Sequence, residues 1–321
     1  MSVIGIDTSN YTTSIAFFNG VDGENCSRLL PVKQGELGLR QSDAVFAHIK
    51  SLPELSGRLF SHIVCREPIT AVGVSTRPRA VEGSYMPCFM VGYSHAKLLS
   101  DYLKVPLIQV SHQQGHVAAS LWSAGRLDLM EKPHLAWHLS GGTTELLLVE
   151  PDGKNVICTK IGGTTDISAG QLIDRTGQLL NLPFPSGKHI DALSQEARMK
   201  DVFRVKCSDY QFSLSGVQNK VQQFHEKVGI PAETAAYALR CVAKAVFLAT
   251  EQALKAYPGC EVVFSGGVAS NSMLRTVMAP VNPIFCQPQF STDNAMGVAV
   301  LAHLATEGSN GTENTIHYPA E

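Results

Sequence analysis

Two histidines four residues apart, His112 and His116, have the type and spacing best suited to binding a metal ion. The apolar run 105–110 before them predicts a buried strand, and the segment 117–122 after them predicts a helix. If Ser111 caps that helix, both imidazoles lie on one helical face and can reach the same ion. A metal site needs at least three ligands, so a pair that only caps the helix or faces a neighbouring element is the alternative.

Asp293 is the candidate for the third ligand. It follows a predicted short strand, 284–286, and precedes a predicted helix, 295–305. As the N-cap of that helix it would have only a structural role. As a ligand it would complete a set of two imidazoles and one carboxylate. Such a set leaves coordination positions free for water or substrate and suits zinc and ferrous iron equally well.

Three turns rich in hydroxyl side chains or glycine follow predicted strands: 8–13 is rich in hydroxyls, and 140–144 and 265–271 also contain paired glycines. The first two each join a pair of strands, and this recurrence predicts an internal duplication. Paired glycines let backbone N–H groups approach an anion closely, as in phosphate-binding sites, although tight hairpins and close strand–helix packing need the same glycines. Asp7 ends the strand before the first turn, and we expect its side chain to point toward any group that this turn binds. The alternative is an Asx or Ser/Thr turn whose side chains form hydrogen bonds only within the turn itself.

Strands and helices alternate along the chain, which predicts an α/β fold with ligand sites at the strand ends. The length of 321 residues suggests two domains, which we place at 1–132 and 133–321. Four basic residues near predicted strand and helix ends are expected to be surface charges or, alternatively, to face an anion. They are Arg40, His48, Arg77 and Arg79.

The composition narrows the class of protein. An apolar content of 44% with 17% charged residues is typical of a compact soluble protein, and the formal charge of −2 argues against a globally basic nucleic-acid coat. No apolar run approaches the ~18 residues of a membrane span, and the first residues lack the features of a signal peptide, so we expect a cytoplasmic protein. The eight scattered cysteines form no CxxC pair and are expected to be reduced thiols.

Six motifs in order resemble the TsaD family, the tRNA threonylcarbamoyladenosine transferases of the actin/Hsp70/sugar-kinase (ASKHA) superfamily, once described as O-sialoglycoprotein endopeptidases. The motifs are SHQQGH, LSGGTTEL, GQLIDRTGQLLNLPFPSG, FSLSG, SGGVASNSMLR and STDNAMG. Each string is weak alone, but six in order are specific, and the likeness runs from residue 3 to about 305. It implies an α/β fold with duplicated ribonuclease-H-like domains. A metallopeptidase is not indicated, because residues 113 and 114 are both Gln and no HExxH motif is formed.

The resemblance also implies a reaction and its site. A threonylcarbamoyl group would pass from threonylcarbamoyl-adenylate to N6 of an adenosine in tRNA, with one Fe or Zn ion bound by His112, His116 and Asp293. Expected partners are tRNA, helper proteins of the same pathway, and a second copy or a related ASKHA protein in a dimer or heterodimer; no membrane is expected. The residues that would bind the adenine nucleotide are Leu139, Ser140, Gly141, Gly142, Thr143, Asp174, Gly187, Asp191 and Asn271.

The chain departs from the family on the acceptor side. An acidic pair common in the first turn is replaced by Tyr11 and Thr12, which leaves Asp7 and Thr12 as the candidate catalytic residues there. The family's GPG turn is Arg-Pro-Arg at 77–79, its PGGP is Pro-Ser-Gly-Lys at 185–188, and Thr143 stands where His is common. Two alternatives follow: a related transferase that uses ATP or a carbamoyl-adenylate and has an acceptor other than tRNA, and a non-catalytic nucleotide-binding partner protein. Retention of all three ligands argues against the second, because a scaffold needs no metal.

Overall fold

A computed structural model describes residues 1–31, 39–63 and 68–307, which divide into two compact units. Unit 1 comprises 1–131, 151–158 and the described residues from Asp293 on; unit 2 comprises 132–150 and 159–292. The division that we placed after residue 132 lies beside the observed start of unit 2. The last segment, however, joins unit 1 rather than the C-terminal unit, because its helix packs on the first sheet.

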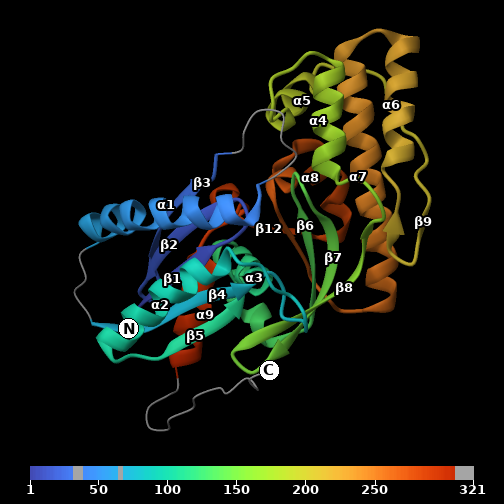
Figure 1. The fold of residues 1–321 in the computed structure, drawn as a ribbon. Coiled ribbons are helices and arrows are strands. Elements are labelled where there is room, and N and C mark those ends of the chain that lie inside the picture. Colours follow the sequence, from blue (N-terminus) through green and yellow to red (C-terminus); the bar gives the residue numbers. More distant parts are fainter. Residues whose placement is uncertain (32–38, 64–67, 308–321) are drawn as a thin grey trace. The chain divides into compact units, whose positions relative to one another are not determined.

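Unit 1 is built on a five-stranded sheet with the order β3-β2-β1-β4-β5 (Figure 1). Its strands are β1 (Ser2–Thr8), β2 (Thr12–Phe18), β3 (Gly23–Leu29), β4 (Ile69–Arg77) and β5 (Leu107–Ser111). The first three run antiparallel as consecutive hairpins, whereas β4 and β5 run parallel to β1. The C-terminal ends of β1, β4 and β5 therefore lie at the same edge of the sheet. His112, the first of the predicted metal ligands, directly follows β5 at this edge.

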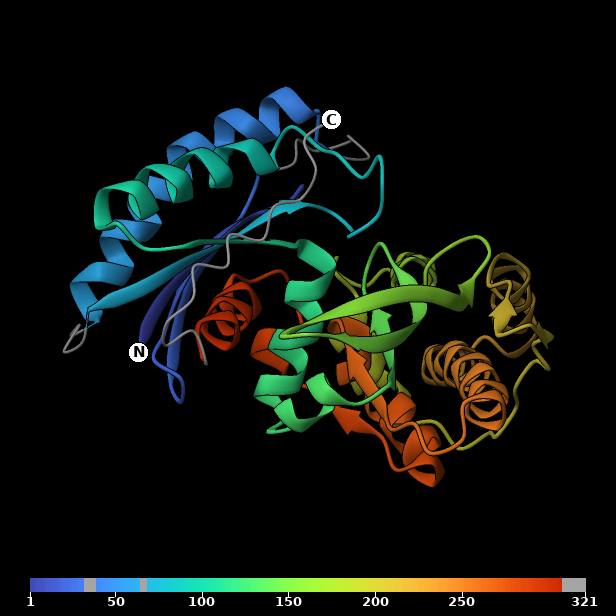
Figure 2. The same cartoon turned by 90° about the horizontal axis from the view of Figure 1, so that it is seen from below.

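Helices cover both faces of this sheet (Figure 2). They are α1 (Gln41–His62), α2 (Phe89–Leu103), α3 (His112–Ser123) and α9 (Met296–Thr306), with a 3-10 turn, η1, over Leu127–Glu131. The first two lie on one face, and α9 lies on the other, with α3 packed against it. Two strand glycines allow α9 to lie directly on the sheet, because a Cβ at Gly5 would stand 2.6 Å from the Ala295 carbonyl oxygen and one at Gly73 would stand 2.8 Å from that of Val298.

Unit 2 contains a seven-stranded sheet with the order β12-β11-β6-β7-β8-β10-β9, apart from the end of its β7–β8 hairpin, 151–158, which groups with unit 1. Its strands are β6 (His134–Leu139), β7 (Thr144–Asp152), β8 (Asn155–Thr164), β9 (Cys207–Ser208), β10 (Gln211–Phe212), β11 (Val262–Ser265) and β12 (Ile284–Phe285). The series β8-β7-β6-β11-β12 repeats the order β3-β2-β1-β4-β5 of the first sheet, again with an antiparallel hairpin followed by parallel strands. The predicted α/β class and the predicted duplication are both confirmed.

The helices of unit 2 pack around α7, a long alanine-rich helix (Figure 1). They are α4 (Ala169–Leu179), α5 (Gly187–Ser194), α6 (Ser215–Val228), α7 (Pro231–Ala256) and α8 (Ser272–Met278), with 3-10 turns η2 (Gly267–Ser270), η3 (Ala279–Val281) and η4 (Pro288–Phe290). The fully buried Trp137 of β6 donates from Nε1 to Oγ1 of Thr250 on α7 at 2.9 Å, which fixes helix and sheet against each other. None of the helices described is long and apolar enough to cross a membrane.

Candidate metal centre and nucleotide site

The start of helix α3 is fixed by a capping box. The Ser111 hydroxyl accepts from the Gln114 backbone N–H at 3.2 Å, and the Gln114 side-chain oxygen accepts from the Ser111 N–H at 2.8 Å. The predicted cap is therefore confirmed, and His112 is the first residue of the helix. Because the helix begins there, His112 and His116 are one turn apart on the same face, as the spacing predicted.

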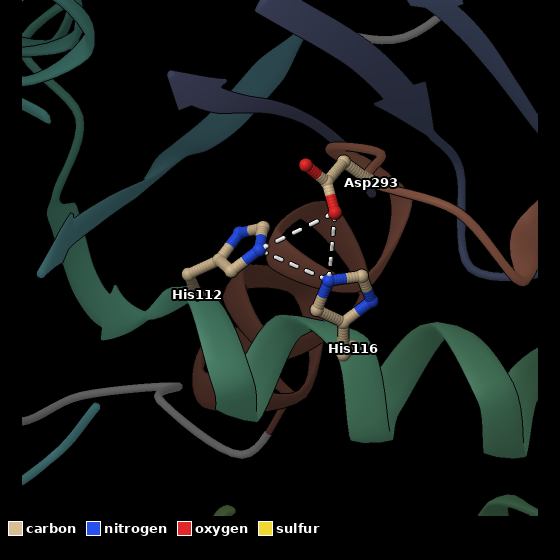
Figure 3. A group of neighbouring side chains, drawn as sticks. All are labelled: His112, His116 and Asp293. Atoms are coloured by element: carbon tan, nitrogen blue, oxygen red, sulfur yellow. Dashed lines mark hydrogen bonds and ion pairs between the residues drawn. The ribbon is translucent and has the colours of Figure 1, made fainter. Parts of the chain in front are cut away.

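The structure brings the three predicted ligands together within unit 1 (Figure 3). His112 Nε2 lies 3.0 Å from His116 Nε2 and 3.6 Å from Asp293 Oδ1, and His116 Nε2 lies 3.1 Å from the same oxygen. Metal–ligand bonds of about 2.0–2.1 Å in a tetrahedral arrangement separate the donor atoms by roughly 3.3 Å. The three donors therefore fit one divalent ion and leave a fourth position for water or substrate.

Asp293 is available as a ligand because other side chains hold the start of helix α9. The Asn294 side-chain oxygen accepts from the Met296 N–H at 3.0 Å, and the Asn25 side-chain oxygen accepts from the Ala295 N–H at 3.0 Å. Our alternative interpretation of Asp293 as the N-cap is thus wrong, because the helix begins three residues later at Met296.

Close packing of two helices sets the distance between the histidines and Asp293. A Cβ placed on Gly297 of α9 would stand 1.8 Å from the carbonyl oxygen of Gly115 on α3 and 2.7 Å from the backbone nitrogen of Ala119. Only glycine permits this approach. Gly115 lies between the two histidines in sequence and Gly297 lies one turn beyond Asp293, so the crossing places the ligands opposite each other.

Asp7, predicted to be catalytic, lies behind His112 and is fully buried. Its two carboxylate oxygens lie 3.0 and 3.1 Å from His112 Nδ1, and the Ser75 hydroxyl also donates to its Oδ1. A carboxylate only accepts, so His112 carries a proton on Nδ1, and Nε2 is the nitrogen that faces the ligand cluster and offers its lone pair once the second proton has left. A carboxylate that holds a ligating histidine in this way is a recurrent feature of metal sites.

Two groups of the cluster, His112 and Asp293, have shifted pKa values. Burial, the largest single influence on His112, lowers its pKa, but the nearby carboxylates of Asp7 and Asp293 together raise the pKa well above its ordinary value. For Asp293, burial raises the pKa, but hydrogen bonds from both histidines outweigh this effect and hold the pKa well below the usual range. Without a metal, the cluster therefore binds a proton that a metal must displace.

We expect metal affinity to fall as the pH falls. Because the pKa of His112 is raised, its imidazole is protonated below that value and must release one proton on binding; Asp293, with its lowered pKa, is already ionised. The apparent dissociation constant should then rise about tenfold for each pH unit of acidification. Titration of the metal-free protein between about pH 6 and pH 8 tests this; an affinity that does not change with pH would contradict it.

Thr12, the second predicted catalytic residue, lies in strand β2, where it pairs with Leu29, and its side chain is buried. Tyr11, just before it in the turn, is 43% exposed. The structure thus brings Asp7 to the ligand cluster by direct contact, whereas the catalytic role of Thr12 stays a prediction.

The predicted nucleotide-binding turn, 139–143, lies within unit 2 between β6 and β7. The Ser140 hydroxyl accepts from the Thr143 N–H at 3.0 Å, and the Ser140 N–H donates to the Thr143 carbonyl at 2.8 Å, which closes the turn. A Cβ at Gly141 or Gly142 would meet open space, so a ligand can approach the backbone from that side. The turn is therefore rigid at its ends and accessible at its glycines.

Two neighbouring elements hold this turn in place. Gly170 of α4 packs against it, since a Cβ there would stand 2.5 Å from the Ser140 carbonyl oxygen. The Ser168 hydroxyl, which caps α4, donates to the Gly141 carbonyl at 2.6 Å. On the other side Gly266, with φ of 89°, lets the third glycine turn approach the Leu139 carbonyl.

The other predicted nucleotide residues also lie in unit 2, and two of them touch. Asp191 of α5 accepts from the Asn271 side-chain amide at 3.0 Å, and Asn271 in turn caps α8 by accepting from the Leu274 N–H at 3.0 Å. Asp174 of α4 accepts from the Ser186 N–H at 2.8 Å, directly before Gly187, and so ties α4 to the start of α5. The four residues join α4, α5 and α8 into one framework.

Several residues of these sites were not predicted from the sequence. Ser168 and Gln171 have the S-x-x-Q spacing of a capping box, a signal that was available in the sequence. Ser75 carries no such signal, because its partner Asp7 is 68 residues away in the chain. The contact of Ser9 with Asp293, 284 residues away in the chain, could not be predicted from the sequence for the same reason.

Comparison with known proteins identifies close sequence relatives. Residues 37–300 match the family model described as TsaD: tRNA N6-adenosine threonylcarbamoyltransferase. A protein of that name from Carboxydothermus hydrogenoformans is 32% identical over 337 residues, which cover 99% of this chain and 96% of that protein. Another, from Streptococcus suis, is 30% identical over 320 residues, covering 94% of this chain and 91% of the relative.

Solved structures with the same fold are more distant in sequence. HypF from T. kodakarensis superposes with a TM-score of 0.63 at 13% identity; the match covers 96% of this chain, which spans 48% of that protein. A ROK family glucokinase from Streptomyces griseus, solved with glucose and AMPPNP, gives a TM-score of 0.53 at 10% identity and covers 94% of this chain and 99% of the glucokinase. At these identities the likeness establishes the fold alone, and it agrees with the predicted α/β fold.

Proposed function

The chain belongs to the TsaD family of tRNA N6-adenosine threonylcarbamoyltransferases, and we propose that it transfers a threonylcarbamoyl group from threonylcarbamoyl-adenylate to N6 of an adenosine in tRNA. The observation that carries the proposal is the convergence of His112, His116 and Asp293, at separations that suit a tetrahedral ion, in a chain of this family. The adenosine N6 would attack the carbamoyl carbonyl carbon, the bond from that carbon to the phosphate oxygen would break, and AMP and a proton would leave.

Family membership implies a divalent metal and an adenylate substrate. We propose Fe or Zn, held by His112, His116 and Asp293, since two imidazoles and a carboxylate suit both ions. The bound ion would supply Lewis-acid polarisation of the carbamoyl carbonyl. Asp7 would hold His112 in the tautomer that keeps Nε2 free, which makes Asp7 a positioning residue in this proposal rather than a base.

For the adenylate we propose the framework of unit 2. The accessible glycines of the 139–143 turn leave room for backbone N–H groups to approach its phosphate, and the turn is braced by α4 and by the third glycine turn. The Asp191–Asn271 pair and the segment from Asp174 to Gly187 support the adenosine part of the proposed site. Fixing the adenylate in this way would lower the entropic cost of the transfer.

Transfer with purified components tests the proposal. The protein, with the helper proteins of the pathway, is incubated with labelled threonylcarbamoyl-adenylate and unmodified tRNA, and the nucleosides are then separated. We expect label in threonylcarbamoyladenosine. Label that is released by hydrolysis, or that enters another acceptor while tRNA stays unmodified, would refute it. The two alternatives, a non-tRNA acceptor and a non-catalytic partner protein, gain no support from the relatives.

We also propose that two copies of this chain form a dimer through helices α1 and α2. On one face of the first sheet these helices expose large apolar side chains, with Phe46 59%, Leu98 72% and Tyr102 83% exposed. Large apolar side chains exposed on neighbouring helices are consistent with a protein–protein contact. Lys97 and Asp101 of α2 pair at 2.5 Å, so the helix carries both signs of charge and does not repel a second copy.

Light scattering during gel filtration should therefore give the mass of a dimer, and Leu98→Glu with Tyr102→Glu should give a monomer, because charged side chains would then meet at the interface. A wild-type monomer that pairs only with a related ASKHA protein would contradict the homodimer.

A tRNA substrate also supports the proposed cytoplasmic location.

A further inference from the structure

The turn after strand β1 makes a direct contact with the carboxylate of Asp293. Ser9 is buried, with 3% of the residue exposed, and its hydroxyl donates to Asp293 Oδ2 at 2.8 Å. The other oxygen, Oδ1, is the one that faces the two histidines. A carboxylate rotates freely about its last side-chain bond unless it is held, so this hydrogen bond fixes which oxygen is presented to an ion.

Ser9 is itself held from behind by His48 of helix α1. We expected His48 at the surface or facing an anion, but it is fully buried. Its Nε2 lies 2.8 Å from the Ser9 carbonyl oxygen and its Nδ1 lies 2.7 Å from the Thr13 hydroxyl. A carbonyl only accepts, so Nε2 carries the proton, and the Thr13 hydroxyl must donate to Nδ1. Burial, the main influence, lowers the pKa of His48 and favours this neutral form.

We propose that Ser9 and His48 are positioning residues for the metal ligand Asp293. Hydrogen bonds run from the Thr13 hydroxyl to His48, from His48 to the Ser9 carbonyl, and from the Ser9 hydroxyl to Asp293. The inference rests on the metal site of the proposed function, but not on its substrate or reaction.

The arrangement mirrors the one at His112. Asp7, two residues before Ser9, orients His112, and Ser9 orients Asp293. One short segment at the end of β1 therefore holds two of the three ligands, each by a hydrogen bond to the ligand atom that does not face the cluster. His48 fixes the backbone of that segment, although it belongs to a helix on the opposite face of the sheet from α9.

Binding of Co²⁺ to the purified protein tests this without any substrate. Ser9→Ala removes only the hydroxyl, and we expect metal affinity to fall by about 10- to 100-fold, the usual cost of losing such a supporting contact. The visible absorption bands of bound Co²⁺ should also shift, because they report ligand geometry. His48→Leu should have a similar effect, whereas His48→Gln, whose side-chain amide can donate to the Ser9 carbonyl, should retain most of the affinity.

Ser100→Ala is the matched control, because Ser100 is also buried in unit 1 but its hydroxyl donates to the Lys97 carbonyl, at 3.0 Å, and among the described residues contacts no metal ligand. It should change neither affinity nor spectrum. If His48→Leu does not fold, Ser9→Ala alone decides. Wild-type affinity and spectrum in Ser9→Ala would overturn the positioning role while leaving the metal site intact. Failure of the wild-type protein to bind Co²⁺ would instead overturn the metal site, and this inference with it.

Discussion

Replacing both histidines, His112→Ala with His116→Ala, is expected to abolish stoichiometric metal binding and with it threonylcarbamoyl transfer. Only the Asp293 carboxylate would remain of the three donor atoms that now converge, and a single carboxylate does not retain a divalent ion against water. Polarisation of the carbonyl by a metal contributes several kcal/mol to the transition state, so the transfer rate should fall by about 10³-fold or more.

Elemental analysis of the purified variants measures this directly. His95→Ala is a suitable control, because His95 lies in the same unit on the exposed side of α2, where its Nδ1 bonds the Val91 carbonyl oxygen at 2.8 Å. The control should keep the metal content and activity of the wild type. An unchanged metal content in the double variant would show that the ion binds elsewhere.

The second large effect is expected from Gly297→Ala, which should both destabilise the protein and weaken metal binding. The added methyl group would stand 1.8 Å from the Gly115 carbonyl oxygen and 2.7 Å from the Ala119 backbone nitrogen, and because both are backbone atoms of α3, no side chain can rotate away to make room. Helices α3 and α9 must then separate, at a cost of about 1–3 kcal/mol or more for overpacking. Because α3 carries both histidines and α9 follows Asp293, the ligand atoms would move apart as well.

Thermal unfolding and metal titration together measure the two effects. Gly57→Ala is the matched control in the same unit: Gly57 lies inside helix α1, and a Cβ there would meet open space. That change should stabilise the protein by roughly 0.5–1 kcal/mol, since alanine is the better helix former. If Gly297→Ala unfolded at the temperature of Gly57→Ala and bound metal normally, the close helix crossing would not position the ligands.

The parts of the site that could be predicted are those encoded locally. The spacing of His112 and His116, the cap at Ser111 and the glycine turns are signals within a few residues, and the structure confirms the helix, its cap and the turns. The duplicated fold was also predictable, because a strand, a small turn and a second strand recur in the chain. Each of these depends on short-range patterns of hydrophobicity and turn chemistry.

The supporting contacts could not be predicted, because each depends on packing between segments far apart in the chain. Ser9 and Asp293 are 284 residues apart, and His48 reaches Ser9 from a helix that the sequence alone does not place on either face of the sheet. The same cause explains why the last helix was assigned to the wrong half: its partners, β1 and β4, come from the start of the chain. Asp7 and His112 are 105 residues apart, so no rule of sequence spacing predicts their hydrogen bond, and a catalytic role of Asp7 stays a prediction.

The most direct test of metal-dependent transfer to tRNA is mass spectrometry of tRNA nucleosides from a strain depleted of its own transferase. The strain expresses either this chain or the His112→Ala, His116→Ala variant at equal levels. We predict that the wild-type chain restores threonylcarbamoyladenosine and that the variant does not. Absence of the modified nucleoside in cells that accumulate the folded, metal-loaded wild-type protein would contradict the proposed function.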